Sequence, residues 1–186
     1  EDFKRLPFMT RCIMETLRLW PAIPNGTFRE LVEDDYIKGR KNKKVKLPKG
    51  TYVQIPNWIR HRHPDLWDDD VDIFNPYRKF KDDELWNGTV INSYNPSSDR
   101  FSPFTYGPRD CIGKNFAQIE MRLILLHLFK NFRVLPSLNK NKYQNKNNMG
   151  FNTFTMGPRN PKNKDLKDNT LGLYVKLVSR NHKSKL

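Results

Sequence analysis

Two cysteines, Cys12 and Cys111, are the whole cysteine content of this 186-residue sequence. So few cysteines argue against a disulfide scaffold and indicate a reducing compartment. Long hydrophobic runs are lacking too, because no apolar stretch reaches the length of a membrane span and no signal peptide is visible. The sequence has no starting methionine and opens within a helical pattern. We therefore expect a fragment, with any membrane association coming from a segment upstream of Glu1.

Acidic residues are scarce relative to basic ones. The chain has 20 Asp and Glu against 34 Lys and Arg, a formal net charge of +14, and a mean hydropathy of -0.81. This balance favours an acidic partner, whether nucleic acid, anionic lipid or protein. Much of the basic charge lies in 40–49, in 140–146 and in the tail from Lys176. The first two runs mix Lys with Asn and carry few aromatic residues, which favours solvated loops over a nucleic-acid-binding patch.

Apolar spacing in the first part of the chain predicts one helix followed by strands. Apolar residues recur at steps of three and four over 1–20 and predict an amphipathic helix that ends before Pro21. These residues are Leu6, Met9, Ile13, Leu17 and Trp20. Residues 27–58 read as short strands, and we expect 35–38 and 51–55 to form a hairpin with the Lys-rich run inserted as a loop. Residues 59–103 have no period and predict an ordered, loop-rich stretch.

A second helix is predicted over 114–132, from apolar residues at helical spacing on a wide face that is typical of a core helix. Those residues include Phe116, Ile119, Leu123, Leu126 and Phe129. A Lys/Asn-rich surface loop is expected over 136–150, and strands over 151–180, with Leu171 to Val178 as the closing strand. The whole chain, 1–186, reads as one domain, mainly α with small β-sheets, in the α+β class.

The stretch F-T-Y-G-P-R-D-C-I-G, residues 104–113, carries the clearest chemistry. Cys111 directly precedes the predicted helix, where backbone N–H groups and the helix dipole favour a thiolate. Glycines in this loop, Gly107 and Gly113, leave room for a flat ligand near the backbone. Arg109 could pair with a carboxylate of that ligand, and Phe104 could shield the sulfur from water. Together they indicate a shielded thiolate that faces a large anionic cofactor such as haem.

Three further residues suggest a buried ion cluster. Glu15 and Arg18 lie three apart on one helix face and can form an ion pair. Arg78, between aromatic residues in F-N-P-Y-R-K-F, would need a partner if it is buried. Among the remaining candidates, His61 in a polar loop reads as solvated, and Cys12 reads as a packed thiol. The four histidines and two cysteines show no zinc-like spacing.

The order E-T-L-R, F-N-P-Y-R and F-T-Y-G-P-R-D-C-I-G resembles the C-terminal part of a cytochrome P450. The resemblance implies a fold that runs from helix K through helix L to the C-terminal strands. It implies Cys111 as the axial ligand of the iron of haem b, with Arg109 and Arg29 on the propionates. Glu15, Arg18 and Arg78 would be structural, and no catalytic residue beyond the haem ligand is expected in these residues.

The same resemblance implies a haem-thiolate monooxygenase that activates O2 and oxidises a small organic substrate. Electrons would come from an NADPH-cytochrome P450 reductase, for which Lys114, Arg122 and Lys130 are candidate docking cations. The expected location is the cytosolic face of the endoplasmic reticulum membrane, without a nucleic-acid partner. The ending T-M-G-P-R-N-P with L-G-L-Y-V is similar to fungal members that oxidise N-formyltyrosine in the dityrosine pathway. The alternative is a basic nucleic-acid-binding domain with an incidental cysteine loop.

Overall fold

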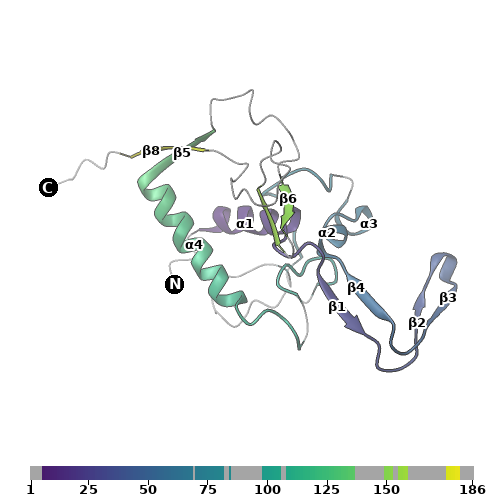
Figure 1. Cartoon of the computed structure of the whole chain (residues 1–186). Helices are drawn as coiled ribbons and strands as arrows, with labels where there is room; N and C mark the ends of the chain where they lie inside the picture. Colours follow the sequence, from purple (N-terminus) through teal and green to yellow (C-terminus); the bar gives the residue numbers. More distant parts are fainter. Residues whose placement is uncertain are drawn as a thin grey trace.

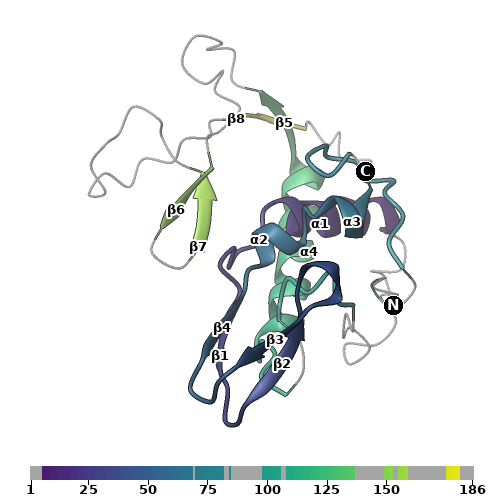
Figure 2. The ribbon, with the colours of Figure 1, turned by 90° about the vertical axis from the view of Figure 1, so that its right-hand side faces the viewer.

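The computed structural model describes residues 6–68, 70–81, 84, 98–105, 108–136, 149–152, 155–158 and 175–180. Within them lie two long helices, two single-turn helices and four separate two-stranded antiparallel sheets (Figure 1). The buried residues lie on helix α1 (Pro7–Leu19), on the short helices and irregular segments that pack against it, and on helix α4 (Lys114–Asn131). The strand pairs between residues 27 and 55 extend away from α1 (Figure 2). No helix in the described part has the length and hydrophobicity to cross a bilayer.

Helix α1, Pro7–Leu19, is the centre of the described core. Pro7 occupies the first turn, where its missing N–H costs nothing and its fixed φ suits the helix. The buried residues on its inner face are Ile13, Met14 and Leu19, together with the charged pair Glu15 and Arg18. The predicted apolar face of α1 is thus partly correct. The buried face also contains two charged residues, Glu15 and Arg18.

The strands after α1 pair differently from the sequence prediction. Strand β1, Thr27–Glu30, pairs with β4, Tyr52–Ile55, and β2, Asp35–Lys38, pairs with β3, Lys44–Leu47. The predicted hairpin between 35–38 and 51–55 is therefore wrong. The Lys-rich run itself supplies β3, whose K-V-K-L alternation suits a strand with one solvated face. A short turn that contains the 3-10 segment η2, Arg40–Asn42, closes this local hairpin and leaves β4 free to pair with β1.

Between β4 and residue 81 the chain forms two short helices and several turns. Helix α2 spans Asn57–Arg60 and α3 spans Pro64–Trp67. Trp67 meets Phe80 and Phe101 edge to face, with ring centroids 5.5 and 5.9 Å away, and Met14 of α1 completes this small cluster. The predicted loop-rich stretch therefore supplies three of the four buried residues of this cluster, because its aromatic residues pack onto α1.

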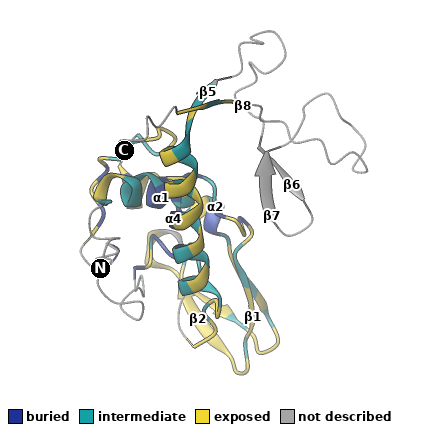
Figure 3. Ribbon diagram, turned by 90° about the vertical axis from the view of Figure 1, so that its left-hand side faces the viewer, coloured by how far each residue is buried: buried dark blue, intermediate teal, exposed yellow. Residues whose placement is uncertain are grey.

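Helix α4, Lys114–Asn131, follows the cysteine loop and leads directly into β5, Phe132–Pro136, which pairs with β8, Val175–Ser179. Gln118 and Arg122 are its buried residues, and many of its other residues are exposed (Figure 3). Large apolar side chains are among the exposed ones. These are Phe116, Leu123, Ile124, Leu126 and Phe129. The prediction of a core helix is wrong for this chain, since no described element covers that face.

The last described strands are β6, Met149–Asn152, and β7, Thr155–Pro158, which pair with each other. Most of the predicted Lys/Asn-rich loop, 137–148, lies outside the described residues, as does 171–174 of the predicted closing strand.

Candidate functional site

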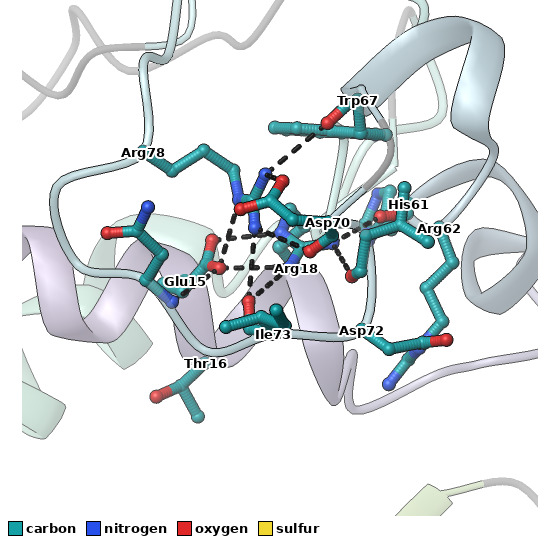
Figure 4. Close-up of polar contacts among 12 residues, drawn as sticks. Glu15, Thr16, Arg18, His61, Arg62, Trp67, Asp70, Asp72, Ile73 and Arg78 are labelled. Atoms are coloured by element: carbon teal, nitrogen blue, oxygen red, sulfur yellow. Dashed lines mark hydrogen bonds and ion pairs between the residues drawn. The ribbon is translucent and has the colours of Figure 1, made fainter.

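A buried carboxylate on α1 holds two arginines. Arg18 donates from Nε and Nη2 to the two carboxylate oxygens of Glu15, at 2.8 and 2.9 Å (Figure 4). Arg78 donates from Nε to Glu15 Oε1 at 3.0 Å, and the Asn75 backbone N–H donates to the same oxygen at 3.0 Å. Glu15 and Arg18 are fully buried, so this is an ion cluster out of contact with water.

The remaining donors of the two arginines hold the chain that crosses α1. Arg18 Nη1 donates to the carbonyls of His61 and Val71, at 2.9 and 2.7 Å. Arg78 donates to the carbonyls of Trp67 and Asp70, and both arginines donate to the carbonyl of Ile73 (Figure 4). Because these carbonyls belong to turns and to the end of α3, the guanidinium groups replace the hydrogen bonds that regular structure would supply.

The cluster keeps Glu15 ionised. Burial raises the pKa of Glu15, but hydrogen bonds from Arg18, from the Asn75 backbone and from Arg78 outweigh it, and the pKa lies below its usual range. Burial lowers the pKa of Arg78, and its bonds to Asp70 and Glu15 more than reverse that effect. The cluster is therefore a charged network whose members depend on each other.

A second buried cluster was missed by sequence reasoning. Glu84 is fully buried and accepts from Arg100 Nε and Nη2, at 2.7 and 2.8 Å, and from the hydroxyl of Ser98. Arg100 also lies over the Trp67 ring, 4.2 Å from its centroid, and donates to the Leu66 carbonyl at 2.8 Å. Glu84 and Arg100 are 16 residues apart in non-periodic sequence, so no spacing rule could have paired them.

His61 is buried, and the prediction of a solvated histidine is wrong. Its Nε2 accepts a hydrogen bond from the Ser102 backbone N–H at 3.2 Å, and its ring lies 5.3 Å from that of Phe101. Burial and the charge of Arg60 lower the pKa of His61 to about 3, against a partial offset from the backbone of Leu17 and Arg18. The ring is therefore neutral and holds residues 101–102, just ahead of the cysteine loop.

Cys111 lies on the surface at the start of α4. Its N–H donates to the Phe104 carbonyl at 3.0 Å, and its own carbonyl accepts from the Lys114 N–H at 3.2 Å. These bonds close the loop and attach it to the first turn of the helix, which Gly113 caps. A Cβ atom at Gly113 would have the Cys111 sulfur, 3.9 Å away, as its one neighbour within 4 Å. The sulfur and the open side of Gly113 thus share one surface.

The other predicted residues of this loop are half-buried or exposed. Phe104 is half-buried, Arg109 is exposed, and the Thr105 hydroxyl donates to the Arg109 carbonyl at 3.3 Å. Thr105 has a φ of 65°, an unusual conformation for a β-branched residue. Gly107 lies outside the described residues. Arg29, on β1, is exposed and donates to its neighbour's carbonyl, Phe28 O, at 2.8 Å, away from any described contact with the loop.

Two free cysteines are described, and burial raises the pKa of Cys12, as expected for a packed thiol. In the described part of the chain, no group of three or more His, Cys, Asp or Glu side chains gathers as a metal site. Cys111 therefore offers a single sulfur donor at an exposed helix start.

The cytochrome P450 family model matches residues 1–164 of this chain. The chain belongs to the cytochrome P450 family. Human cytochrome P450 4F8 is 36% identical over 136 residues, 73% of this chain and 23% of the relative. Cytochrome P450 52-N1 of Starmerella bombicola is 37% identical over 139 residues, 73% of this chain and 25% of the relative. This P450 chain thus spans about a quarter of the length of the curated relatives that it matches.

Solved P450 structures share its fold. The retinoic acid bound cyanobacterial CYP120A1 superposes with a TM-score of 0.68 and 28% identity, over 97% of this chain and 34% of that one. A second cytochrome P450, CYP102L1, gives a TM-score of 0.65 and 26% identity over 96% of this chain and 33% of that one. The chain is therefore a partial P450 fold with small helices and small antiparallel sheets.

The surface around Cys111 is compatible with the haem that P450 membership implies. Ile112, which follows Cys111 in the chain, is fully exposed, and Phe116 in the first turn of α4 is largely exposed, so exposed apolar side chains follow the cysteine closely in the sequence. Gly113 adds no side chain to obstruct a flat ring, and the exposed Arg109 is available for a carboxylate. One soft sulfur donor, exposed apolar side chains and a nearby cation match the chemistry of an iron porphyrin with acidic substituents.

Proposed function

We propose that this chain is the C-terminal part of a haem-thiolate monooxygenase, running from helix K (α1) through helix L (α4), with Cys111 as the axial ligand of haem b. The observation that carries the proposal is the exposed sulfur at the start of α4, beside an unobstructed glycine and followed in the sequence by exposed apolar side chains, in a chain of this family. Haem held there would supply an iron centre for O2 activation, with the thiolate favouring O–O cleavage.

On this proposal several residues hold the haem, each with a different role. Arg109 and Arg29 pair with the two propionates, and both guanidinium groups are exposed and available. Phe104 packs beside the sulfur and limits access of water. Gly113, together with Gly107, lets the ring approach the backbone. The Glu15–Arg18–Arg78 cluster has a structural role, since it is fully or nearly buried and bonds to backbone carbonyls.

The whole protein, on this proposal, oxidises an organic substrate with electrons from an NADPH-dependent reductase, at the cytosolic face of the endoplasmic reticulum membrane. Basic side chains near Cys111 favour an acidic electron donor. Lys130 is exposed and remains a candidate for that contact, and Lys114 forms an ion pair with Asp110. Arg122 is buried and bonds to Gln118 and Thr10, so its assignment to the docking surface is wrong.

The substrate is proposed no more narrowly than a small organic molecule. The similarity to fungal enzymes of N-formyltyrosine oxidation is not supported by the matches, which include nematode, human and yeast proteins. The alternative of a nucleic-acid-binding domain predicts arginines interleaved with aromatic residues on one face, which the Lys/Asn runs do not supply.

Haem reconstitution of the Cys111→Ser variant tests the proposal, with Cys12→Ser as the matched control. We expect the unchanged protein and the control to give the red-shifted absorbance of the reduced, CO-bound thiolate form, because Cys12 lies on α1 within the packed body. The Cys111 variant should lose that band. Retention of the band by Cys111→Ser, or its loss in Cys12→Ser, would contradict the assignment of the ligand.

A further inference from the structure

Helix α2 is held between two segments that lie far apart in the sequence. On one side, its first residues bind the segment between α1 and β1. Asn57 Nδ2 donates to the Ile23 carbonyl at 3.1 Å, and the Trp58 N–H donates to the Pro24 carbonyl at 2.9 Å. Asn57 is 1% exposed, so its amide lies inside the packed body. This end of α2 is therefore a fixed point of attachment.

The last residue of α2 reaches the segment that leads to the cysteine loop. Arg60 Nη2 donates to Asn57 Oδ1 at 2.8 Å and also to the hydroxyl of Ser102. Because an Nη group carries two N–H bonds, a single nitrogen can join the two side chains. Arg60 and Ser102 are 42 residues apart in the sequence. Arg60 thus links α2 to a distant part of the chain.

Every polar group of Ser102 is engaged in a hydrogen bond. Its hydroxyl accepts from Arg60, its N–H donates to His61 Nε2 at 3.2 Å, and its carbonyl accepts from the Thr105 N–H at 3.0 Å. Ser102 is 1% exposed, so water cannot replace a lost partner unless the structure opens. The position of Ser102 is therefore set by these three bonds.

The hydrogen bonds continue from Ser102 to the cysteine. Phe104 follows Ser102 by two residues, and its carbonyl accepts from the Cys111 N–H at 3.0 Å. A displacement of Ser102 would therefore move the residue that holds Cys111. The cluster around Glu15 does not make this link, since its described hydrogen bonds end within residues 61–75.

The site of Arg60 is unfavourable for a charge. Burial lowers the pKa of Arg60, and the charge of Asp99 offsets only part of that effect. The Arg60 Nε is buried, and no described group accepts a hydrogen bond from it. Since a buried donor without a partner is destabilising, filling space alone would favour an apolar side chain here. The guanidinium group is explained instead by the two acceptors that its Nη2 joins.

We propose that Arg60 is a positioning residue for Cys111. By binding Asn57 and Ser102 with one nitrogen, Arg60 sets where the cysteine loop lies relative to the body of the chain. The inference rests on the proposed function, because the position of the sulfur matters for haem only if that sulfur is the iron ligand. Arg60 acts through Ser102 and the loop backbone and takes no part in the chemistry.

Variants of the full-length protein that remove opposite ends of one hydrogen bond test the proposal. Arg60→Met removes the donor, Ser102→Ala removes the acceptor, and a double variant combines them. The matched control is Arg62→Met. Arg62 is also half-buried, but it lies over the Trp58 ring, 3.4 Å from the centroid, and pairs with Asp72 at 3.2 Å. None of its described bonds reaches the cysteine loop.

Two measurements report the position of Cys111. The first is amide hydrogen exchange in the peptide that contains Cys111, which measures how often the bond to the Phe104 carbonyl opens. The second is the fraction of bound haem that gives the red-shifted absorbance of the reduced, CO-bound thiolate form. The two measurements are independent, since the first requires no haem signal.

We expect hydrogen exchange at Cys111 to be about 10-fold or more faster in Arg60→Met, as for the loss of one hydrogen bond to a charged group. The thiolate fraction should fall too, because groups that orient a metal ligand contribute about 10- to 100-fold to metal affinity. Ser102→Ala should show both changes. The double variant should be no worse than Arg60→Met, since the two substitutions remove the same bond. Arg62→Met should change exchange by less than about twofold.

Three results would overturn the proposal. The first is hydrogen exchange and thiolate content equal to the parent's in Arg60→Met and Ser102→Ala. If Arg60→Met does not fold, Ser102→Ala, which lacks only a hydroxyl, decides this point. The second is an equal change in Arg62→Met, which would indicate general loosening. The third is a double variant whose effect is the sum of the single effects. A parent protein without the thiolate band would instead contradict the proposed function, and with it the link from Arg60 to haem.

Discussion

Arg100 forms a double hydrogen bond with the buried carboxylate of Glu84 and lies over the Trp67 ring, four residues before Phe104 of the cysteine loop. Arg100→Met would leave the Glu84 charge buried beside apolar groups. Since burial raises the pKa of Glu84 and Arg100 is the main group that lowers it, the carboxylate would lose its chief support. We expect a loss of about 3–5 kcal/mol in the free energy of unfolding, measured by urea denaturation.

The double variant Glu84→Met/Arg100→Met is the control for this prediction. Removing both charges leaves no uncompensated ion, so the double variant should be more stable than Arg100→Met alone. If the two substitutions prove simply additive, the pair is not coupled and the predicted role of Arg100 is wrong.

Glu15→Gln should be among the most damaging single substitutions in this chain. The change keeps the shape but removes the charge that both Arg18 and Arg78 bind in a buried setting. We expect unfolding free energy to fall by about 3–5 kcal/mol. The control is Asp34→Asn, which breaks the Lys46 ion pair at a site where both side chains are about half exposed. That loss should stay below about 1 kcal/mol, and equal effects of the two variants would contradict the prediction.

The contrast between these clusters shows what the sequence could predict. Glu15 and Arg18 were found because helical spacing places residues three apart on one face. Glu84 and Arg100 were not found, since their contact depends on how non-periodic chain folds over Trp67. His61 read as solvated because its sequence neighbours are polar, whereas its environment comes from Ser102 and Phe101, some 40 residues away.

The strands and α4 show a second limit of prediction from sequence patterns, which give the position of an element but not its partners. Local alternation predicted the bounds of β2 and β4 nearly to the residue. Which strands pair depends on all the strands that compete for a partner, and β3 was not predicted as a strand because its lysines read as a solvated loop. On α4 the spacing predicted the helix within one residue at each end. It could not show that Leu123 and Phe129 would be exposed, because burial depends on elements that must lie against them.

His61 predicts a pH dependence of stability. Its pKa in the folded chain, about 3, lies below the ordinary value of 6.5, so the unfolded chain binds a proton that the folded chain excludes. The contribution is complete above pH 6.5 and is lost as the pH falls toward 3. Between pH 6.5 and about pH 5 it amounts to about 2 kcal/mol.

The variant His61→Gln removes the titratable imidazole and keeps a side-chain acceptor for the Ser102 N–H. We expect the variant's unfolding free energy to fall less than the parent's between those two pH values. His127→Gln, a change on the exposed side of α4, controls for loss of an imidazole. Parallel pH curves for the parent and His61→Gln would mean that the pKa of His61 is not lowered in the folded protein, which would contradict the prediction.

Gly26 and Gly50 form a matched pair at turns. Both have positive φ, 66° and 81°, so an alanine at either position carries backbone strain of about 1–2 kcal/mol. At Gly26 an added Cβ would lie 1.8 Å from the Ile55 carbonyl oxygen, whereas at Gly50 nothing lies within 4 Å. We expect Gly50→Ala to cost about 1 kcal/mol, and Gly26→Ala to cost several times more because β1 and β4 must separate. Thermal unfolding of the two variants side by side measures the difference.

Thr105 is in a left-handed conformation next to the half-buried Phe104, within the loop that ends at Cys111. Its backbone N–H donates to Ser102 at 3.0 Å, which fixes this conformation, and its hydroxyl donates to Arg109 at 3.3 Å on the surface. Thr105→Ala removes the hydroxyl and keeps the strain, whereas Thr105→Gly removes both. The glycine variant should therefore be more stable than the alanine variant by about 1 kcal/mol in urea denaturation. Equal stability of the two would mean that the loop relaxes to a negative φ at residue 105, and that the Cys111 loop is not held in the described shape.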